Sequence, residues 1–116
     1  MSFENKYEVT SFNADINEFK VQAIFNDSYS KEIQILMPKG SMMQEHSAPA
    51  PIIVQVLKGE IDFIIDNKAN NLKEFDCIRV KANIAHSLIA KDNSIIRLSL
   101  FKNDTFSRVC SVKIKQ

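Results

Sequence analysis

Apolar and polar residues alternate with a period of two along most of the chain. In residues 16–25 the apolar side chains occupy nearly every second position, and charged or polar side chains take the others. The same alternation recurs at four further places, in residues 32–37, 60–65, 96–100 and 110–114. This period is typical of β-strands with one buried face. Residues 51–57 instead form a nearly continuous apolar run, which predicts a strand buried on both faces.

Short clusters rich in Gly, Asn, Asp and Pro separate these runs. They read PKGS, KG, DNKANN, KDNS and KNDT. Many short strands joined by such turn-forming residues indicate an all-β sandwich or barrel. No segment keeps a helical period for long enough to form a recognition helix. We therefore predict an all-β fold with one domain over residues 1–116, without repeats or linkers.

Composition narrows the function classes. The 116 residues suffice for one hydrophobic core, and 45% hydrophobic with 25% charged residues is ordinary for a folded protein. With 15 basic and 14 acidic residues, the formal charge of +1 provides no broad cationic surface, so we expect no nucleic acid partner. The first twenty residues do not resemble an export signal and no apolar stretch could span a membrane, which predicts a cytoplasmic protein without a membrane partner. Cys77 and Cys110 are far apart in sequence and are expected to be reduced.

The two glycines and the two histidines of the chain cluster in two segments. Gly40 and Gly59 are predicted to lie in turns that require a positive φ, and they bracket His46. His86 lies in NIAHSLIA, at the same parity as apolar neighbours. Two inward-facing imidazoles on separate strands would meet inside a barrel.

The stretch GSMMQEHSAPAPIIVQVLKG resembles the first motif of the cupin family. That motif runs as Gly, five residues, His, one residue, His, three or four residues, Glu, six residues, Gly. Here Gly40, His46 and Gly59 match it, whereas Ala48 replaces the second histidine and Ile52 replaces the glutamate.

The stretch FDCIRVKANIAHSLIA resembles the second cupin motif, in which His86 matches the histidine. Other residues replace the motif's glycine, proline, second glycine and asparagine; in order, they are Phe75, Lys81, Asn83 and Ala90. The first motif covers about residues 40–59 and the second about 75–90, with a short spacer as in small bacterial cupins. The resemblance implies a small double-stranded β-helix, or jelly-roll, barrel.

The resemblance also implies where a metal would bind. Typical cupin centres use three histidines and one glutamate, at the positions held here by His46, Ala48, His86 and Ile52. Alanine and isoleucine cannot coordinate a metal, so His46 and His86 form an incomplete set, suited to a divalent transition metal such as Zn, Ni, Fe, Mn or Cu. No cofactor is assigned beyond that.

Two side chains are candidates to complete the set. Strict alternation gives Gln44 the same parity as His46, and Cys77 lies in the second motif. Alternatively, both histidines are core or cavity residues that hydrogen-bond to each other, to the backbone or to water.

Three function hypotheses follow from these residues. The first is a cupin that binds a small molecule in its barrel cavity, without catalysis or with only weak metal binding. The second is a metal-dependent oxygenase or isomerase that holds a small polar substrate against an ion on the two histidines. The third is a protein that binds a macromolecular partner with its outer sheet. The cavity of the first hypothesis is lined by His46, His86, Gln44, Ala48 and Ile52.

We also expect a homodimer. Small cupins commonly pair through their terminal strands, and apolar strand edges tend to seek a partner. The alternative is that the terminal aromatic rings close the ends of one barrel. The rings concerned are Phe3, Phe12, Phe19, Phe25, Phe101 and Phe106.

Overall fold

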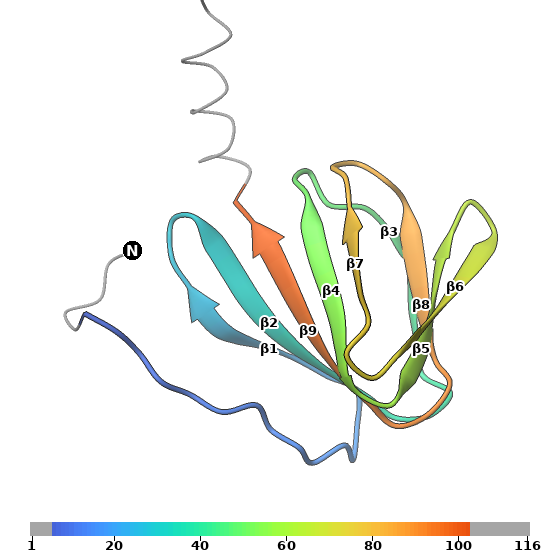
Figure 1. Ribbon diagram of the computed structural model, residues 1–116, viewed down its shortest axis with the longest axis horizontal. Helices are drawn as coiled ribbons and strands as arrows, with labels where there is room; N and C mark the ends of the chain where they lie inside the picture. Colours follow the sequence, from blue (N-terminus) through green and yellow to red (C-terminus); the bar gives the residue numbers. More distant parts are fainter. Residues whose placement is uncertain (1–5, 103–116) are drawn as a thin grey trace, which may run out of the picture.

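The structure is a computed structural model that describes residues 6–102. This part of the chain contains nine strands and no helix, so none of its segments is a membrane-spanning helix. The strands are β1 (Lys20–Asn26), β2 (Ser30–Met37), β3 (Met42–His46), β4 (Ile52–Lys58), β5 (Glu60–Ile65), β6 (Lys68–Lys73), β7 (Cys77–Val80), β8 (His86–Ala90) and β9 (Ser94–Phe101). They form two antiparallel sheets, ordered β1-β2-β9-β4-β7 and β3-β8-β5-β6, which face each other in Figure 1. The all-β prediction is confirmed.

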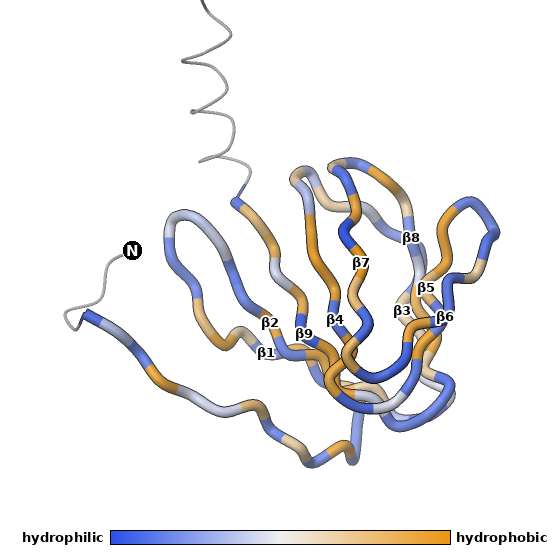
Figure 2. Tube along the Cα trace, in the orientation of Figure 1, coloured by the Kyte–Doolittle hydropathy of each residue, from blue (hydrophilic) through white to orange (hydrophobic). Residues whose placement is uncertain are grey.

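The predicted alternation builds the core between the two sheets. On β2, Ile33 and Ile35 are buried, and they lie opposite Leu98 and Ile96 of β9. From the other sheet, Phe63 of β5 is fully buried against this layer. Figure 2 shows the same division, with apolar residues along β4 and hydrophilic residues at the end of the β5–β6 hairpin. Period two therefore determines which side chains of each strand reach the interior.

The prediction that residues 51–57 form a strand buried on both faces is wrong. On β4, Ile52, Val54 and Val56 are buried, whereas Ile53 and Leu57 are only half-buried. β4 has hydrogen-bonded neighbours on both sides, β9 and β7, but only one of its faces meets the second sheet. The apolar residues Ile53 and Leu57 thus lie on the outer face of the sheet, where they are only partly buried.

The segment DNKANN was predicted as a turn, but only its first two residues form one. Asp66 and Asn67 both have positive φ, of 51° and 62°, as a tight turn between two antiparallel strands requires. Residues 68–73 then form β6, which pairs with β5 at the edge of the four-stranded sheet. The strand was missed because it is polar almost throughout, with Leu72 as its one buried residue.

The two glycines have the predicted positive φ, 87° at Gly40 and 90° at Gly59. Gly59 has a second requirement, because a Cβ there would collide with the backbone oxygen of Asn93 and the hydroxyl of Ser94. Nothing lies within 4 Å of the corresponding position at Gly40. Gly59 therefore allows close packing where the chain passes from one sheet to the other, whereas Gly40 only allows a turn.

Phe75 and Asn83 occupy the two positions where the second cupin motif has glycine. Both have left-handed backbones, with φ of 74° and 65°. Each is held by a hydrogen bond from its own N–H, Phe75 to the carbonyl of Val56 and Asn83 to the carbonyl of Ala48, at 2.7 Å in both cases. The turns thus keep a glycine-type conformation without glycine, with backbone strain of about 1 kcal/mol at each position.

The segment that precedes β1 lies against the outer face of the five-stranded sheet. Asn13 donates its backbone N–H to Oε1 of Gln34 at 3.0 Å, and Nε2 of Gln34 donates to the carbonyl of Asn13. These bonds satisfy a side-chain amide that is only 1% exposed. The strand predicted near residues 110–114, like Phe3 and Phe106, lies outside the described residues.

Candidate functional site

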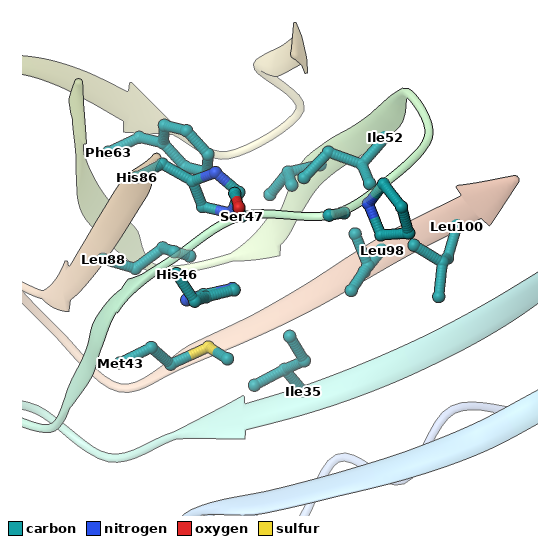
Figure 3. A pocket seen from close by; sticks show the side chains of 13 residues that line it. Ile35, Met43, His46, Ser47, Ile52, Phe63, His86, Leu88, Leu98 and Leu100 are labelled. Carbon is teal, nitrogen blue, oxygen red and sulfur yellow. The ribbon is translucent and has the colours of Figure 1, made fainter. Parts of the chain in front are cut away.

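A cavity of about 300 Å³ lies between the two sheets, at the low end of the range for small-molecule pockets. Figure 3 shows side chains from both sheets, and from the loop between β3 and β4, around it. Its lining is mostly aliphatic. The residues are Ile35, Met43, His46, Ser47, Ala48, Pro49, Ile52, Val54, Phe63, His86, Leu88, Leu98 and Leu100.

The structure brings the two histidines together in this cavity. His46 ends β3 and His86 begins β8, and the two residues lie directly opposite each other in the antiparallel pair. Their ring centroids are 4.4 Å apart, with the rings inclined at 64°. Phe63 stacks on the imidazole of His86, with centroids 5.0 Å apart and planes 19° apart. The three aromatic rings thus form one cluster in the lining of the cavity.

Gln44 does not line the cavity, contrary to the prediction from alternation. Between Met43 and His46 the pairing with β8 shifts, because three steps on β3 match two steps from Leu88 to His86. Such a bulge adds one residue and inverts the parity beyond it. Met43 therefore shares the inner face with His46, while Gln44 is exposed.

Cys77 is also absent from the cavity. It begins β7, pairs with Gln55 of β4 and is exposed as a free thiol. Its neighbour Ile78 lies opposite the cavity residue Val54 and packs against the core. The parity of β7 therefore points Cys77 away from the two histidines.

Both imidazoles are held in one tautomer by main-chain carbonyls. Nδ1 of His46 lies 2.7 Å from the carbonyl oxygen of Gln44, and Nδ1 of His86 lies 2.9 Å from that of Ile84. A carbonyl oxygen only accepts, so Nδ1 must carry the hydrogen in each ring. In the neutral rings, Nε2 then presents a lone pair.

The two rings differ in burial. His86 is 2% exposed, whereas His46 is exposed at the mouth of the cavity. Burial lowers the pKa of His86 below the ordinary value of 6.5; the hydrogen bond to Ile84 opposes this, and the charge of His46 adds to it. His86 is therefore neutral at pH 7, with its Nε2 lone pair available.

The lining also contains the two residues that replace metal ligands in the first motif. Ala48 and Ile52 both face the cavity, and neither carries a donor atom. Within residues 6–102 no group of three or more His, Cys, Asp or Glu side chains is placed to hold a metal ion. The described donors are thus two imidazoles, which do not fit a resident centre with four protein ligands.

Several lining residues could have been found in the sequence. Phe63, Leu98 and Leu100 lie at the inward parity of runs that alternate, and they face the cavity once those strands pair. Ser47 had no such signal, because it follows the bulge in an irregular loop. Pairing, rather than residue type, selects which inward residues reach the cavity.

Comparison with known proteins decides the family. The model for the cupin domain matches residues 33–101, more than half of the chain. The chain belongs to the cupin family. No curated protein matches this cupin's sequence. The prediction of one domain over residues 1–116 extends beyond the matched region and stays a prediction.

Solved structures support the jelly-roll prediction. A cupin superfamily protein from Desulfitobacterium hafniense has a TM-score of 0.73 and 16% identity, over 79% of this chain and 84% of that one. An RmlC-like cupin from Methanocaldococcus jannaschii, described as a double-stranded β-helix, has a TM-score of 0.72 and 20% identity, over 89% and 98%. A Streptococcus pyogenes protein of unknown function has a TM-score of 0.71 and 21% identity, over 88% and 96%. At these identities the likeness shows the fold alone.

Proposed function

We propose that this cupin binds a small organic molecule in its barrel cavity and catalyses no reaction on it. The observation that carries the proposal is the cavity itself, which is lined by aliphatic side chains and has two imidazoles as its polar anchors. Small-molecule sites have this composition, with apolar walls and a few polar groups that orient the ligand. His46, His86, Ala48 and Ile52 are its predicted ligand contacts, and Gln44 is removed from that set.

The lining of the cavity offers few polar groups for catalysis. Histidine is the commonest general acid or base, but the described lining combines its two imidazoles with only one hydroxyl, from Ser47, and with no carboxylate. Ala48 and Ile52 stand where the cupin motif has two metal ligands, and Ile52 is 4% exposed among core residues. We infer that the cavity is a metal site that has become mostly apolar.

Weak metal binding is the second candidate function. The two Nε2 lone pairs, one on His46 and one on His86, favour it, because neutral imidazole is a good ligand for divalent transition metals. An enzyme of the oxygenase or isomerase type, acting on a small polar substrate, requires a more complete set. Metal analysis of protein purified without chelator separates the candidates. The binding function predicts sparse metal, whereas a metalloenzyme predicts near-stoichiometric metal that His86→Ala abolishes together with activity.

A fragment screen by ligand-observed NMR tests the binding function directly. Leu98 lines the cavity from β9, and Arg97 is its exposed neighbour on the same strand. Leu98→Trp should fill the cavity and abolish the binding of any hit, whereas Arg97→Trp adds the same ring on the outside and should leave binding intact. Hits that survive Leu98→Trp, or a screen without hits against the wild type, would contradict the proposal.

We propose that the protein is a homodimer that pairs through β1. This strand is an edge of the five-stranded sheet, and Val21 is 52% exposed although it lies opposite the cavity residue Ile35. Antiparallel pairing of β1 with β1 of a second copy, about a twofold axis, would cover this edge strand and the exposed side chain of Val21. Lys20 is the only charged residue of β1, so the two ammonium groups would lie at opposite ends of the paired strands.

The terminal aromatic rings are consistent with this dimer. Phe19 is 42% exposed and Phe101 is 37% exposed, so neither is buried in the barrel of one chain. Sedimentation analysis should show a dimer that Val21→Lys converts to a monomer. Phe75→Lys, which changes an exposed ring in the turn before β7, the other edge strand of the same sheet, is the matched control and should remain dimeric. A monomeric wild type would refute the pairing.

We further propose a cytoplasmic location. Cys77 is exposed and has no disulfide partner among the described residues. An accessible free thiol is common in reducing compartments and unusual in secreted proteins. Localisation of a tagged chain by fractionation tests this.

A further inference from the structure

The orientation of the two imidazoles specifies what kind of polar group the cavity receives. Each ring turns Nδ1 toward the carbonyl oxygen of the residue two positions earlier in the chain, Gln44 for His46 and Ile84 for His86. Both hydrogens are therefore committed to the backbone. What each neutral ring can still offer is the acceptor Nε2.

Nε2 of His86 opens to the cavity although the residue is 2% exposed. Nδ1 makes the hydrogen bond of this side chain, and none of the described residues has a sealed side-chain nitrogen or oxygen atom without a partner. Nε2 must therefore be accessible, and the cavity is the space that the ring lines. At the mouth of the same cavity, the exposed ring of His46 provides a second acceptor. Its centroid lies 4.4 Å from that of His86.

The rest of the described lining excludes charged ligands. It contains no Lys, Arg, Asp or Glu, and Ser47 is its only other polar side chain. A carboxylate or phosphate would meet the Nε2 lone pair of His86 and no Lys or Arg, and a buried ammonium group would find no Asp or Glu as counter-ion. Burying an unpaired charge is far more costly than burying a neutral polar group that makes a hydrogen bond. The hydrogen-bond pattern thus matches an uncharged donor.

We propose that the ligand is an uncharged molecule with an apolar body and a hydroxyl or N–H group that donates to Nε2 of His86. This assignment rests on the proposed binding function and specifies its ligand class. The aliphatic walls cover the body of the ligand, and His46 accepts a second donor hydrogen where the ligand has one. The volume of about 300 Å³ accommodates a ring of benzene size with substituents, since a cavity of about 150 Å³ already holds benzene.

Three probes of similar shape and different hydrogen bonding test this assignment. They are p-cresol, which donates; 4-methylanisole, in which a methyl group replaces the donated hydrogen; and p-toluate, which is an anion. Binding is measured by titration calorimetry with EDTA present, so that no metal ion bridges probe and protein. We expect p-cresol to bind about tenfold more tightly than 4-methylanisole, because the ether leaves Nε2 unpaired. We expect p-toluate to bind the weakest.

His86→Leu is the decisive variant, since it removes the acceptor but keeps an apolar side chain of similar size. The ratio of the two dissociation constants should fall from about ten to about one, chiefly through weaker p-cresol binding. Ser47→Ala removes the hydroxyl of the described lining and keeps both imidazoles; it is the matched control, so the ratio should persist.

A measurement on the wild type keeps the test valid if His86→Leu fails to fold. Nitrogen-15 spectra of the imidazoles should show Nε2 of His86 unprotonated, and its resonance should move with p-cresol but not with 4-methylanisole. Equal binding of these two probes, or tighter binding of p-toluate, overturns the donor assignment and leaves the binding function standing. Absence of binding by all three probes overturns the donor assignment, and if the fragment screen is also silent it overturns the binding function as well.

Discussion

The two motif segments of this cupin differ in what they retain. Residues 40–59 keep both glycines of their motif, whereas residues 75–90 have Phe75 and Asn83 in place of theirs, yet the backbone is left-handed at all four positions. Strand pairing and the hydrogen bonds from Phe75 and Asn83 impose this conformation on residues that disfavour it. A turn conformation can thus be maintained by its surroundings.

The metal-ligand positions of the motif differ from the turns, because the surrounding residues do not compensate for the substitutions there. Ala48 and Ile52 occupy their places in the lining, but neither side chain carries a donor atom, and among the described lining residues only Ser47 adds a side-chain oxygen to the two imidazoles. Many surrounding residues together determine a backbone conformation, whereas a metal ligand requires a donor atom on one particular side chain. The cavity thus has two imidazoles and, at the two other ligand positions of the motif, side chains without donor atoms.

The largest effect should come from restoring those ligands. In Ala48→His combined with Ile52→Glu, four donors would face one cavity, and we expect affinity for Zn²⁺ or Ni²⁺ to rise by at least about a thousandfold, or about 4 kcal/mol. Titration calorimetry and metal analysis measure this gain. The single change Ala48→His is the partial control. Unchanged affinity in the double variant would mean that the lining has also lost the geometry of a metal site.

Gly59→Ala should be the most damaging change to a turn. The added Cβ would meet the Asn93 carbonyl and Ser94 at a positive φ, so we expect a loss of about 3 kcal/mol in the free energy of unfolding. Gly40→Ala, where the same atom meets nothing, should cost only about 1 kcal/mol. Urea unfolding of both variants measures the difference. Equal losses would show that φ alone, rather than close packing, accounts for Gly59.

Phe75→Gly should stabilise the protein slightly or leave it unchanged. The ring is 73% exposed, so little buried area is lost, and glycine removes a strain of about 1 kcal/mol. The greater freedom of glycine in the unfolded chain offsets part of that gain. Urea unfolding again provides the measurement. A clear destabilisation would mean that Phe75 has a partner surface, such as one on a second chain.

Acidification should destabilise the fold through His86. Burial lowers the pKa of His86 below 6.5, so the unfolded chain takes up a proton at a higher pH than the folded chain. The stabilisation is complete above pH 6.5 and is lost as the pH falls from there toward the folded-state pKa. Urea unfolding of wild type and His86→Leu between about pH 7.5 and pH 5 tests this, and the variant should show the shallower decline. Identical pH profiles would exclude His86 as the source.

Much of the fold could be predicted because the alternation of apolar and polar residues along a strand indicates directly which side chains are buried. The inward residues of β2, β5 and β9 followed from alternation, and the meeting of His46 and His86 followed from the parity of His86 and from the family motifs. β6 was missed because an edge strand with one buried residue has almost no hydrophobic pattern. Gln44 was misplaced because a single extra residue in β3 inverts the parity, and a bulge leaves no signal in residue type.

The sequence by itself determined an all-β cupin with two histidines and without two of its motif's metal ligands, because these are properties of residue identity and spacing. The tertiary structure alone decided that both Nδ1 atoms bond to carbonyls, that Phe63 stacks on His86, and that one histidine is buried while the other is exposed. These features depend on strand register and on the bulge in β3, which arise only when distant strands pair.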